Sequence, residues 1–123
     1  MYDVIKTYSK VVDTYIHVSG FCMSMGIPVL CSVPVEYRYA HPNTIFMIHQ
    51  VSSISFGVVA DMEQDIEHTK FLQDRLFDII KNNTNIPSAK LEQVYREKLD
   101  WFITAEEALK YGLISKITDD PIL

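Results

Sequence analysis

The chain lacks the features that mark membrane, secreted and nucleic-acid-binding proteins. No apolar stretch reaches the ~18 residues of a membrane-spanning helix, and the first ten residues, MYDVIKTYSK, do not form a signal peptide. Its 11 Lys and Arg residues are outnumbered by 16 Asp and Glu residues, for a net charge of −5. We therefore expect neither a membrane partner nor a nucleic-acid partner.

Cysteine is also scarce. Cys22 and Cys31 are the two cysteines, and they form neither a C-x-x-C pair nor a Cys/His set at zinc spacing. Two cysteines in apolar surroundings are typical of reduced core residues, which favours a cytoplasmic location. We expect no metal site.

The remaining composition is that of one globular domain. The chain has 123 residues, of which 48% are apolar and 22% are charged, and it shows no repeat or linker. Predicted strands alternate with predicted helices, which indicates an α/β domain with parallel strand pairing over residues 1–123. We expect helices over 1–12, 25–33, 58–81, 88–98 and 104–112, strands over 14–19, 35–40, 44–50, 99–103 and 113–117, and a loop or exposed arm over 51–57.

Two local signals mark the helix near the C-terminus. Thr104 and Glu107 have the spacing of a capping box, in which the hydroxyl caps the helix while the carboxylate reaches back. Gly112 stands at the position after a helix where a residue in the left-handed conformation is common.

In the longest predicted helix, the apolar residues are expected near one wide face: Val59, Met62, Ile66, Leu72, Leu76, Phe77 and Ile80.

Ser24 lies in GFCMSMGIPVL (20–30), where a predicted strand gives way to a predicted helix. The N–H groups at a helix start have no partner within the helix, so they can stabilise an oxyanion beside a serine. Gly20 and Gly26 leave room for a substrate. A serine at this point is also a common helix N-cap. From the serine alone, the cap is the more frequent interpretation and the nucleophile is the alternative.

His49 and Asp100 are the other two candidate site residues. His49 ends an apolar strand, TIFMIHQ, where α/β folds keep their sites, although a structural histidine is the commoner case. Asp100 lies in the apolar run LDWF, where a carboxylate needs a partner such as an imidazole, unless it is a rim residue. Together the three residues offer a nucleophile, a base and an orienting carboxylate.

The other histidines and the acidic residues of the long helix receive structural interpretations. We expect His17 to alternate within a strand, His41 to precede a turn, and His68 to lie on a solvated helix face. The acidic residues of that helix are expected to form a solvated face rather than a metal site: Glu63, Asp65, Glu67 and Asp74.

Four segments resemble the ClpP-type serine proteases. GFCMSMG resembles that family's G-x-A-A-S-M-G, and YRYAHPNTIFMIHQ resembles its R-x-A-L-P-N-[ST]-x-x-M-I-H-Q. FGVVADME resembles the handle region, here about 51–84, and LDWFITAEEALKYGLISKI resembles D-x-F-[LM]-[ST]-A-x-E-A-x-x-Y-G-L-[IV]-D-x-[IV]. The resemblance extends over almost the whole chain, apart from roughly two extra residues near 85–91.

The resemblance implies the ClpP/crotonase-type α/β fold, a spiral of β-β-α units. It implies Ser24 as nucleophile, His49 as general base, Asp100 as its orienter and the Met25 backbone N–H as an oxyanion donor. It further implies a serine endopeptidase that needs no cofactor. Its subunits would form heptameric rings, stacked through the handle as a tetradecamer, and would receive unfolded polypeptides from an AAA+ ATPase in the cytoplasm.

This chain departs from the family pattern in three ways. Members carry about the first third of the fold, including a Gly-rich oxyanion loop, before the helix that matches residues 1–12. Ser52-Ser53 replaces the handle's glycine pair, which restricts positive φ. Cys22-Met23 replaces Ala-Ala and Pro28 enters the next helix, which suggests a divergent branch such as a phage capsid-maturation protease. A ring subunit without activity and a crotonase-type acyl-CoA enzyme are the alternative functions.

Overall fold

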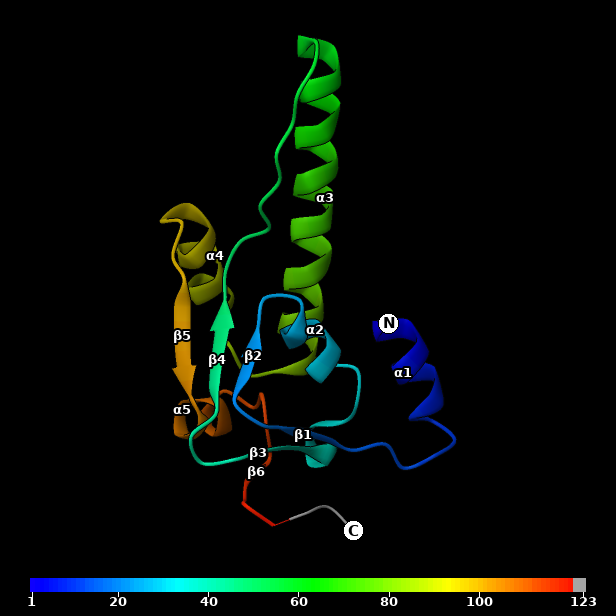
Figure 1. Cartoon of the computed structure of the whole chain (residues 1–123), viewed down its shortest axis with the longest axis vertical. Helices are drawn as coiled ribbons and strands as arrows, with labels where there is room; N and C mark the ends of the chain where they lie inside the picture. The colour runs from blue at the N-terminus through cyan, green and yellow to red at the C-terminus, as the bar shows by residue number, and fades with distance from the viewer. Residues whose placement is uncertain (121–123) are drawn as a thin grey trace.

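The computed structural model describes residues 1–120 and shows a mixed α/β body from which one helix projects (Figure 1). The elements follow the order α1 (Tyr2–Tyr8), β1 (Ile16–Val18), β2 (Phe21–Met23), α2 (Gly26–Leu30), a 3₁₀ turn (Val35–Tyr37), β3 (Arg38–Ala40), β4 (Ile45–Ile48), α3 (Val59–Asn83), α4 (Ser88–Arg96), β5 (Trp101–Thr104), α5 (Ala105–Lys110) and β6 (Lys116–Ile117). Among the described residues, no helix combines the length and apolar character needed to cross a bilayer.

The strands form two three-stranded sheets, ordered β1-β3-β6 and β2-β4-β5. Along the chain, β1, β2 and α2 form one β-β-α unit, and β3, β4 and α3 form the next. The first strand of each unit enters one sheet and the second strand enters the other. This alternation confirms the expected fold of repeated β-β-α units.

Parallel pairing is confirmed for every strand pair except one. β1, β3 and β6 pair in parallel, as do β2 and β4, but β5 runs antiparallel to β4. The strand β2 (Phe21–Met23) is not predicted by the sequence, because GFCM (20–23) is too short to show a strand pattern between the predicted strand and the predicted helix. The expected strand over 35–40 begins instead as the 3₁₀ turn, and only 38–40 pair as a strand.

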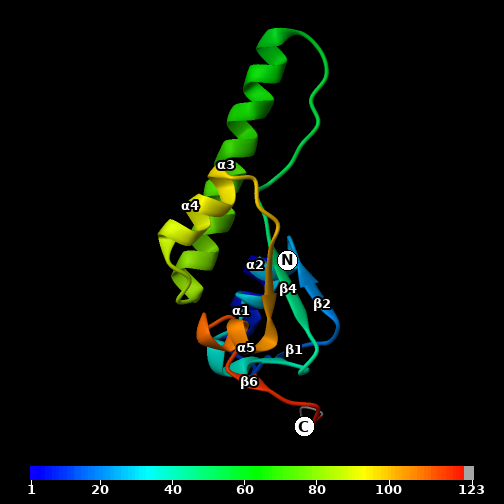
Figure 2. The ribbon, with the colours of Figure 1, turned by 90° about the vertical axis from the view of Figure 1, so that its left-hand side faces the viewer.

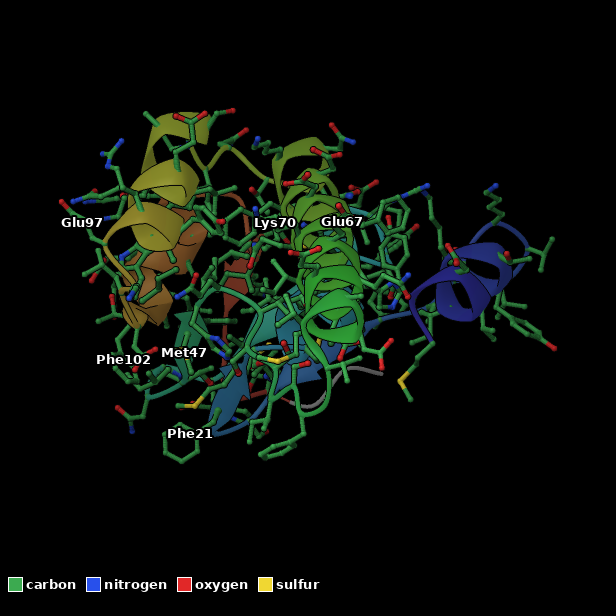
Figure 3. All side chains as sticks on the ribbon, turned by 90° about the horizontal axis from the view of Figure 1, so that it is seen from above. Phe21, Met47, Glu67, Lys70, Glu97 and Phe102 are labelled. Atoms are coloured by element: carbon green, nitrogen blue, oxygen red, sulfur yellow. The ribbon has the colours of Figure 1, made fainter. Side chains whose placement is uncertain are left out.

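The core lies between the sheets and the helices. Apolar residues from β4, α2, α4 and β5 are almost completely buried there: Phe46, Ile48, Ile27, Leu30, Leu91, Val94 and Ile103. Alternation along β4 explains this arrangement, since Phe46 and Ile48 face inward while Ile45 and Met47 face the other side. That outer side of the β2-β4-β5 sheet also carries the exposed Phe21 and Phe102 (Figure 3).

A buried arginine joins three separate segments of the body. Arg38 is 2% exposed, and its guanidinium donates hydrogen bonds to backbone carbonyls at the ends of α3 and α5 and after α2. The acceptors are Val33 (2.9 Å), Asn83 (2.8 Å) and Gly112 (3.2 Å). These charge-assisted bonds satisfy carbonyls that helix ends leave without partners.

The Thr104 cap and the left-handed end of α5 are confirmed, but the Glu107 carboxylate accepts a hydrogen bond from the Thr104 hydroxyl (3.2 Å) rather than from the Thr104 N–H that a capping box uses. The Thr104 hydroxyl accepts a hydrogen bond from the Glu107 N–H at 3.2 Å, as an N-cap does. Gly112 has φ +70°, and the Gly112 and Leu113 N–H groups donate to the Leu109 and Ala108 carbonyls. These two bonds form a Schellman motif, which ends the helix.

The long helix α3 is only half anchored. Of its expected apolar face, Phe77 and Ile80 are buried, whereas Val59 is 70% and Ile66 is 52% exposed. Figures 1 and 2 show why: the N-terminal half of α3 and the segment 51–57 project together away from the body. The expected apolar face is therefore buried only in the C-terminal half of α3. Beside the N-terminal half lies the segment 51–57, where Ser53 and Ser55 form side-chain hydrogen bonds with Thr69 (3.1 Å) and Asp65 (2.6 Å).

Candidate active site

Three strand ends meet at one edge of the β2-β4-β5 sheet. Ser24 directly follows β2, His49 directly follows β4, and Asp100 directly precedes β5. Because β2 and β4 are parallel and β5 is antiparallel to β4, these three ends lie at the same edge. The sheet therefore gathers residues that are far apart in the sequence.

Ser24 occupies a tight turn between β2 and α2. Its φ is +54°, a left-handed conformation that non-glycine residues rarely adopt. Two backbone hydrogen bonds hold the turn, one from the Ser24 N–H to the Met47 carbonyl (3.0 Å) and one from the Ile27 N–H to the Ser24 carbonyl (3.1 Å). A strained strand–turn–helix geometry of this kind presents a side chain outward, as a nucleophile elbow does.

Ser24 is not the N-cap of α2. The capping position belongs to Met25, which makes no side-chain capping bond. Among residues 1–120, the Ser24 hydroxyl forms no hydrogen bond, and the residue is exposed. The cap interpretation therefore fails for this serine, because in the described residues its hydroxyl accepts no hydrogen bond from the N–H groups at the start of α2.

His49 is half-buried, and its ring has a defined contact. Nδ1 contacts the backbone carbonyl of Gln50. A carbonyl oxygen can only accept a hydrogen bond, so this contact fits the tautomer that carries its proton on Nδ1 and leaves Nε2 as the basic nitrogen. In this tautomer, the imidazole is ready to accept a proton from a hydroxyl group through Nε2.

Asp100 faces His49 in register without contacting it. The last β4·β5 pair is Ile48 with Trp101, so His49 and Asp100 are the next facing positions. Within the described part of the chain, no hydrogen bond or ion pair joins these two side chains, and Asp100 is exposed. The structure thus brings Ser24 and His49 to one cavity, whereas Asp100 lies beside that cavity.

The cavity that holds Ser24 and His49 has a volume of about 270 Å³. Apolar residues from α2, β4 and the buried half of α3 make most of its wall: Met25, Ile27, Pro28, Ile48, Leu76, Phe77 and Ile80. Val51, Ser52 and Gln73 complete the lining. A cavity of this kind accepts an apolar side chain next to the hydroxyl and the imidazole.

Gln73 is the site residue that the sequence analysis missed. It is 4% exposed, and its Oε1 accepts a hydrogen bond from the Val51 N–H at 2.5 Å. Its Nε2 is buried without a partner among the described residues. The available signal was its helical spacing, because Gln73 shares the buried face of α3 with Phe77 and Ile80.

Backbone N–H groups suited to an oxyanion follow Ser24. Among residues 1–120, the backbone N–H groups of Met25 and Gly26 donate to no backbone carbonyl in a turn, a loop or a helix cap. Gly26 is also tightly placed, since a Cβ there would lie 3.3 Å from the Cys22 Sγ. The small residue therefore lets the chain turn closely beside β2.

The other candidate groups take structural roles. Cys22 and Cys31 are buried free thiols, and burial raises their pKa values to about 12 and about 11. His17 lies in β1, with Nε2 3.1 Å from the Thr118 carbonyl, and its ring stacks on that of His41. His68 and the acidic residues of α3 are exposed, and no three side chains in 1–120 are arranged to hold a metal ion.

The family model described as Clp protease matches residues 1–121. A protein of Deinococcus radiodurans named ATP-dependent Clp protease proteolytic subunit is 36% identical over 97% of this chain and 56% of its own length. A protein of the same name from Paracoccus denitrificans is 32% identical, over 95% of this chain and 57% of its own length. Proteolytic subunit 2 from Chlamydia muridarum is 34% identical, over 95% and 56%. The chain thus spans slightly more than half the length of these relatives.

Proposed function

This chain belongs to the Clp protease family, and on that premise we propose that it is a serine endopeptidase that hydrolyses peptide bonds of unfolded polypeptides. The observation that carries this proposal is the position of Ser24. Its hydroxyl stands on a left-handed turn at the end of β2 and lines the same cavity as His49. A nucleophile beside a base, with free backbone N–H groups next to it, is the arrangement used for acyl transfer.

In the proposed reaction, the Ser24 Oγ attacks the carbonyl carbon of the scissile peptide. The hydroxyl proton passes to the His49 Nε2, and the developing oxyanion accepts a hydrogen bond from the Met25 N–H. When the C–N bond breaks, His49 returns the proton to the leaving amine. Water, activated by the same imidazole, then hydrolyses the acyl-enzyme and frees Ser24.

Asp100 is the proposed orienter of the imidazolium. Its carboxylate would accept a hydrogen bond from His49 Nδ1 and stabilise the charge that forms on the ring. Nδ1 would then exchange the Gln50 carbonyl for the carboxylate, across facing positions of the β4·β5 register. This exchange needs side-chain rotation and leaves the strand pairing unchanged.

The proposed assembly follows the named role of the relatives as proteolytic subunits of an ATP-dependent protease. We infer heptameric rings, two of which stack through the handle region at about 51–84, a partner AAA+ ATPase that delivers unfolded chains, and a cytoplasmic location. The exposed apolar side chains of the projecting segment support contact with another subunit. Ile54 is 83% and Phe56 is 86% exposed.

The experiment that tests the chemistry is active-site labelling with a fluorophosphonate, followed by intact mass. The wild-type chain should gain one adduct at Ser24, and Ser24→Ala and His49→Ala should not react. Ser32→Ala is the control, since Ser32 is a buried serine that donates to the Val29 carbonyl. Labelling of Ser24→Ala at the wild-type rate would refute the proposal.

A second candidate function is that of a ring subunit without activity. The separation between His49 and Asp100 favours it, since no bond joins them in the described residues. In that case the chain would enter rings with other subunits, and neither labelling nor peptide cleavage would depend on Ser24.

A further inference from the structure

We infer that Gln73 is a positioning residue for His49, acting through the peptide unit that joins Gln50 to Val51. This inference rests on the proposed function. It assigns to the long helix a direct part in setting the protonation of the catalytic base. The relevant contacts all belong to buried or half-buried groups at the base of the projecting helix.

One peptide unit connects the helix to the imidazole. The Val51 N–H donates to the Gln73 Oε1, and the Gln50 carbonyl of the same peptide accepts from the His49 Nδ1. A trans peptide is planar and directs its N–H and C=O to opposite sides. Gln73 therefore sets the orientation of the whole unit, and with it the position of the acceptor that holds the His49 proton.

Gln73 is well placed to hold this peptide. It lies on the same face of α3 as Phe77 and Ile80, which are anchored in the core. In the N-terminal direction, α3 leaves the body (Figure 2). Counted from that end, Gln73 is the first of the buried residues of the helix. The amide is thus fixed by core packing on the side that faces the site.

The consequence for the chemistry concerns the histidine tautomer. A backbone carbonyl that accepts from Nδ1 keeps the proton on that nitrogen and leaves Nε2 free to take the Ser24 proton. A hydrogen-bond partner of this kind orients the ring as well as selecting the tautomer. Without Gln73, the Gln50–Val51 peptide loses this anchor. Because no bond joins Asp100 to the resting imidazole in the described residues, the ring then returns to the Nε2–H tautomer that free histidine prefers, and Nδ1 has no proton to pass on to the carboxylate.

The geometry offers a sharp pair of variants. Gln73→Leu has a similar volume and removes the acceptor for the Val51 N–H. Gln73→Glu keeps an oxygen that can accept from the Val51 N–H. It replaces the Gln73 Nε2 group, which forms no hydrogen bond in the described residues, so no existing bond is lost. Gln93→Leu makes the same chemical change on α4, at a residue outside the cavity lining.

The test records the tautomer of His49 by ¹⁵N NMR of histidine-labelled protein and the rate of fluorophosphonate labelling. His49→Ala assigns the signal. We expect Nδ1–H in the wild type, Gln73→Glu and Gln93→Leu, and Nε2–H in Gln73→Leu. The labelling rate of Gln73→Leu should fall by roughly 10- to 100-fold, the usual effect of losing a partner that orients an imidazole.

The outcomes separate this inference from the proposed function. If Gln73→Leu keeps the wild-type tautomer, Gln73 does not position His49, whatever the enzyme does. If the tautomer changes but the wild type never reacts with the fluorophosphonate, the positioning role stands and the proposed peptidase activity fails. Equal loss in Gln73→Glu and Gln73→Leu would also overturn the inference, because the acceptor would then be irrelevant.

Discussion

His49 and Asp100 face each other one position beyond the last paired residues of β4 and β5, yet their side chains are not bonded. Facing residues in an antiparallel ladder have Cβ atoms about 4.5–5.5 Å apart. The register therefore places the two residues on neighbouring strands, and the proposed triad requires side-chain rotation to bring the Asp100 carboxylate to the imidazole. In the described state, the Gln50 carbonyl occupies the hydrogen-bonding position that the proposed triad gives to the carboxylate.

Replacing Asp100 with Asn tests the proposed orienting role. Because an amide can donate its N–H to Nδ1, it would favour the wrong tautomer, and the rate of peptide cleavage should fall by up to about 10⁴-fold. Asp100 is exposed, so the midpoint of urea unfolding should stay the same. Glu97→Gln, which neutralises a nearby exposed carboxylate, should retain the rate. Wild-type cleavage by Asp100→Asn would remove Asp100 from the mechanism.

The left-handed turn at Ser24 predicts an unusual order of stabilities. Both Ser24→Gly and Ser24→Ala lack the hydroxyl, but only glycine adopts φ +54° without a steric penalty. The Gly variant should have the larger free energy of unfolding, by about 1 kcal/mol. The same pair at Ser9, whose φ is −64°, should show the opposite order. Urea unfolding measures the free energy of unfolding of all four variants. If Gly and Ala rank in the same order at both sites, the left-handed conformation of Ser24 is contradicted.

Burial of Cys22 predicts a thiol that does not react. Its pKa is raised to about 12 by burial, against an ordinary value of 9.0. At pH 9 the native thiol should therefore resist iodoacetamide, whereas the unfolded chain in urea should react quickly. The native state keeps this proton longer than the unfolded state does, so the contribution to stability is complete below pH 9 and is lost as the pH rises towards 12.

The alkaline loss of stability offers a second measurement of the same thiol. Free energies of unfolding measured from pH 8 to pH 11 should fall more steeply for the wild type than for Cys22→Ala, which lacks the Cys22 thiol and retains only that of Cys31. Identical slopes for the two proteins, or rapid alkylation of native Cys22, would contradict its burial.

Arg38 should be one of the most sensitive positions for folding. Its three hydrogen bonds join the ends of α3 and α5 to β3, and burial lowers its pKa from the ordinary value. Arg38→Leu would leave three carbonyl groups without this donor and should cost about 3 kcal/mol or more of unfolding free energy. Arg75→Leu, at an exposed position on α3, should cost less than about 1 kcal/mol. Similar losses at both sites would show that the buried bonds add little.

Local features of the fold were predictable because their causes are local. The cap at Thr104 and the left-handed Gly112 depend on a few neighbouring residues, so both were found from their spacing. The apolar run TIFMIHQ predicted a buried strand for the same reason. The strand β2 was missed, since three residues carry too little periodicity to separate a strand from a turn.

Long-range features of the site were harder to predict from the sequence. The chemistry and sequence positions of Ser24, His49 and Asp100, and then the resemblance of their segments, predict them as site residues, but their geometry depends on sheet order and on the antiparallel register of β5. The burial of Gln73 had only a weak signal, its helical spacing with Phe77 and Ile80, because a glutamine on a helix is ordinarily a solvated residue. Its bond to Val51 exists only because α3 packs beside the end of β4.

The sequence by itself determined the family, the order of most elements and the chemical identity of the candidate residues, because motifs and short-range periodicity are written along the chain. The tertiary structure decided which strand ends meet at one edge, which half of α3 is buried, and which bond holds the peptide unit beside His49. These depend on pairing and packing between distant segments, where a shift of one register position changes every neighbour. A linear pattern carries no direct record of such contacts.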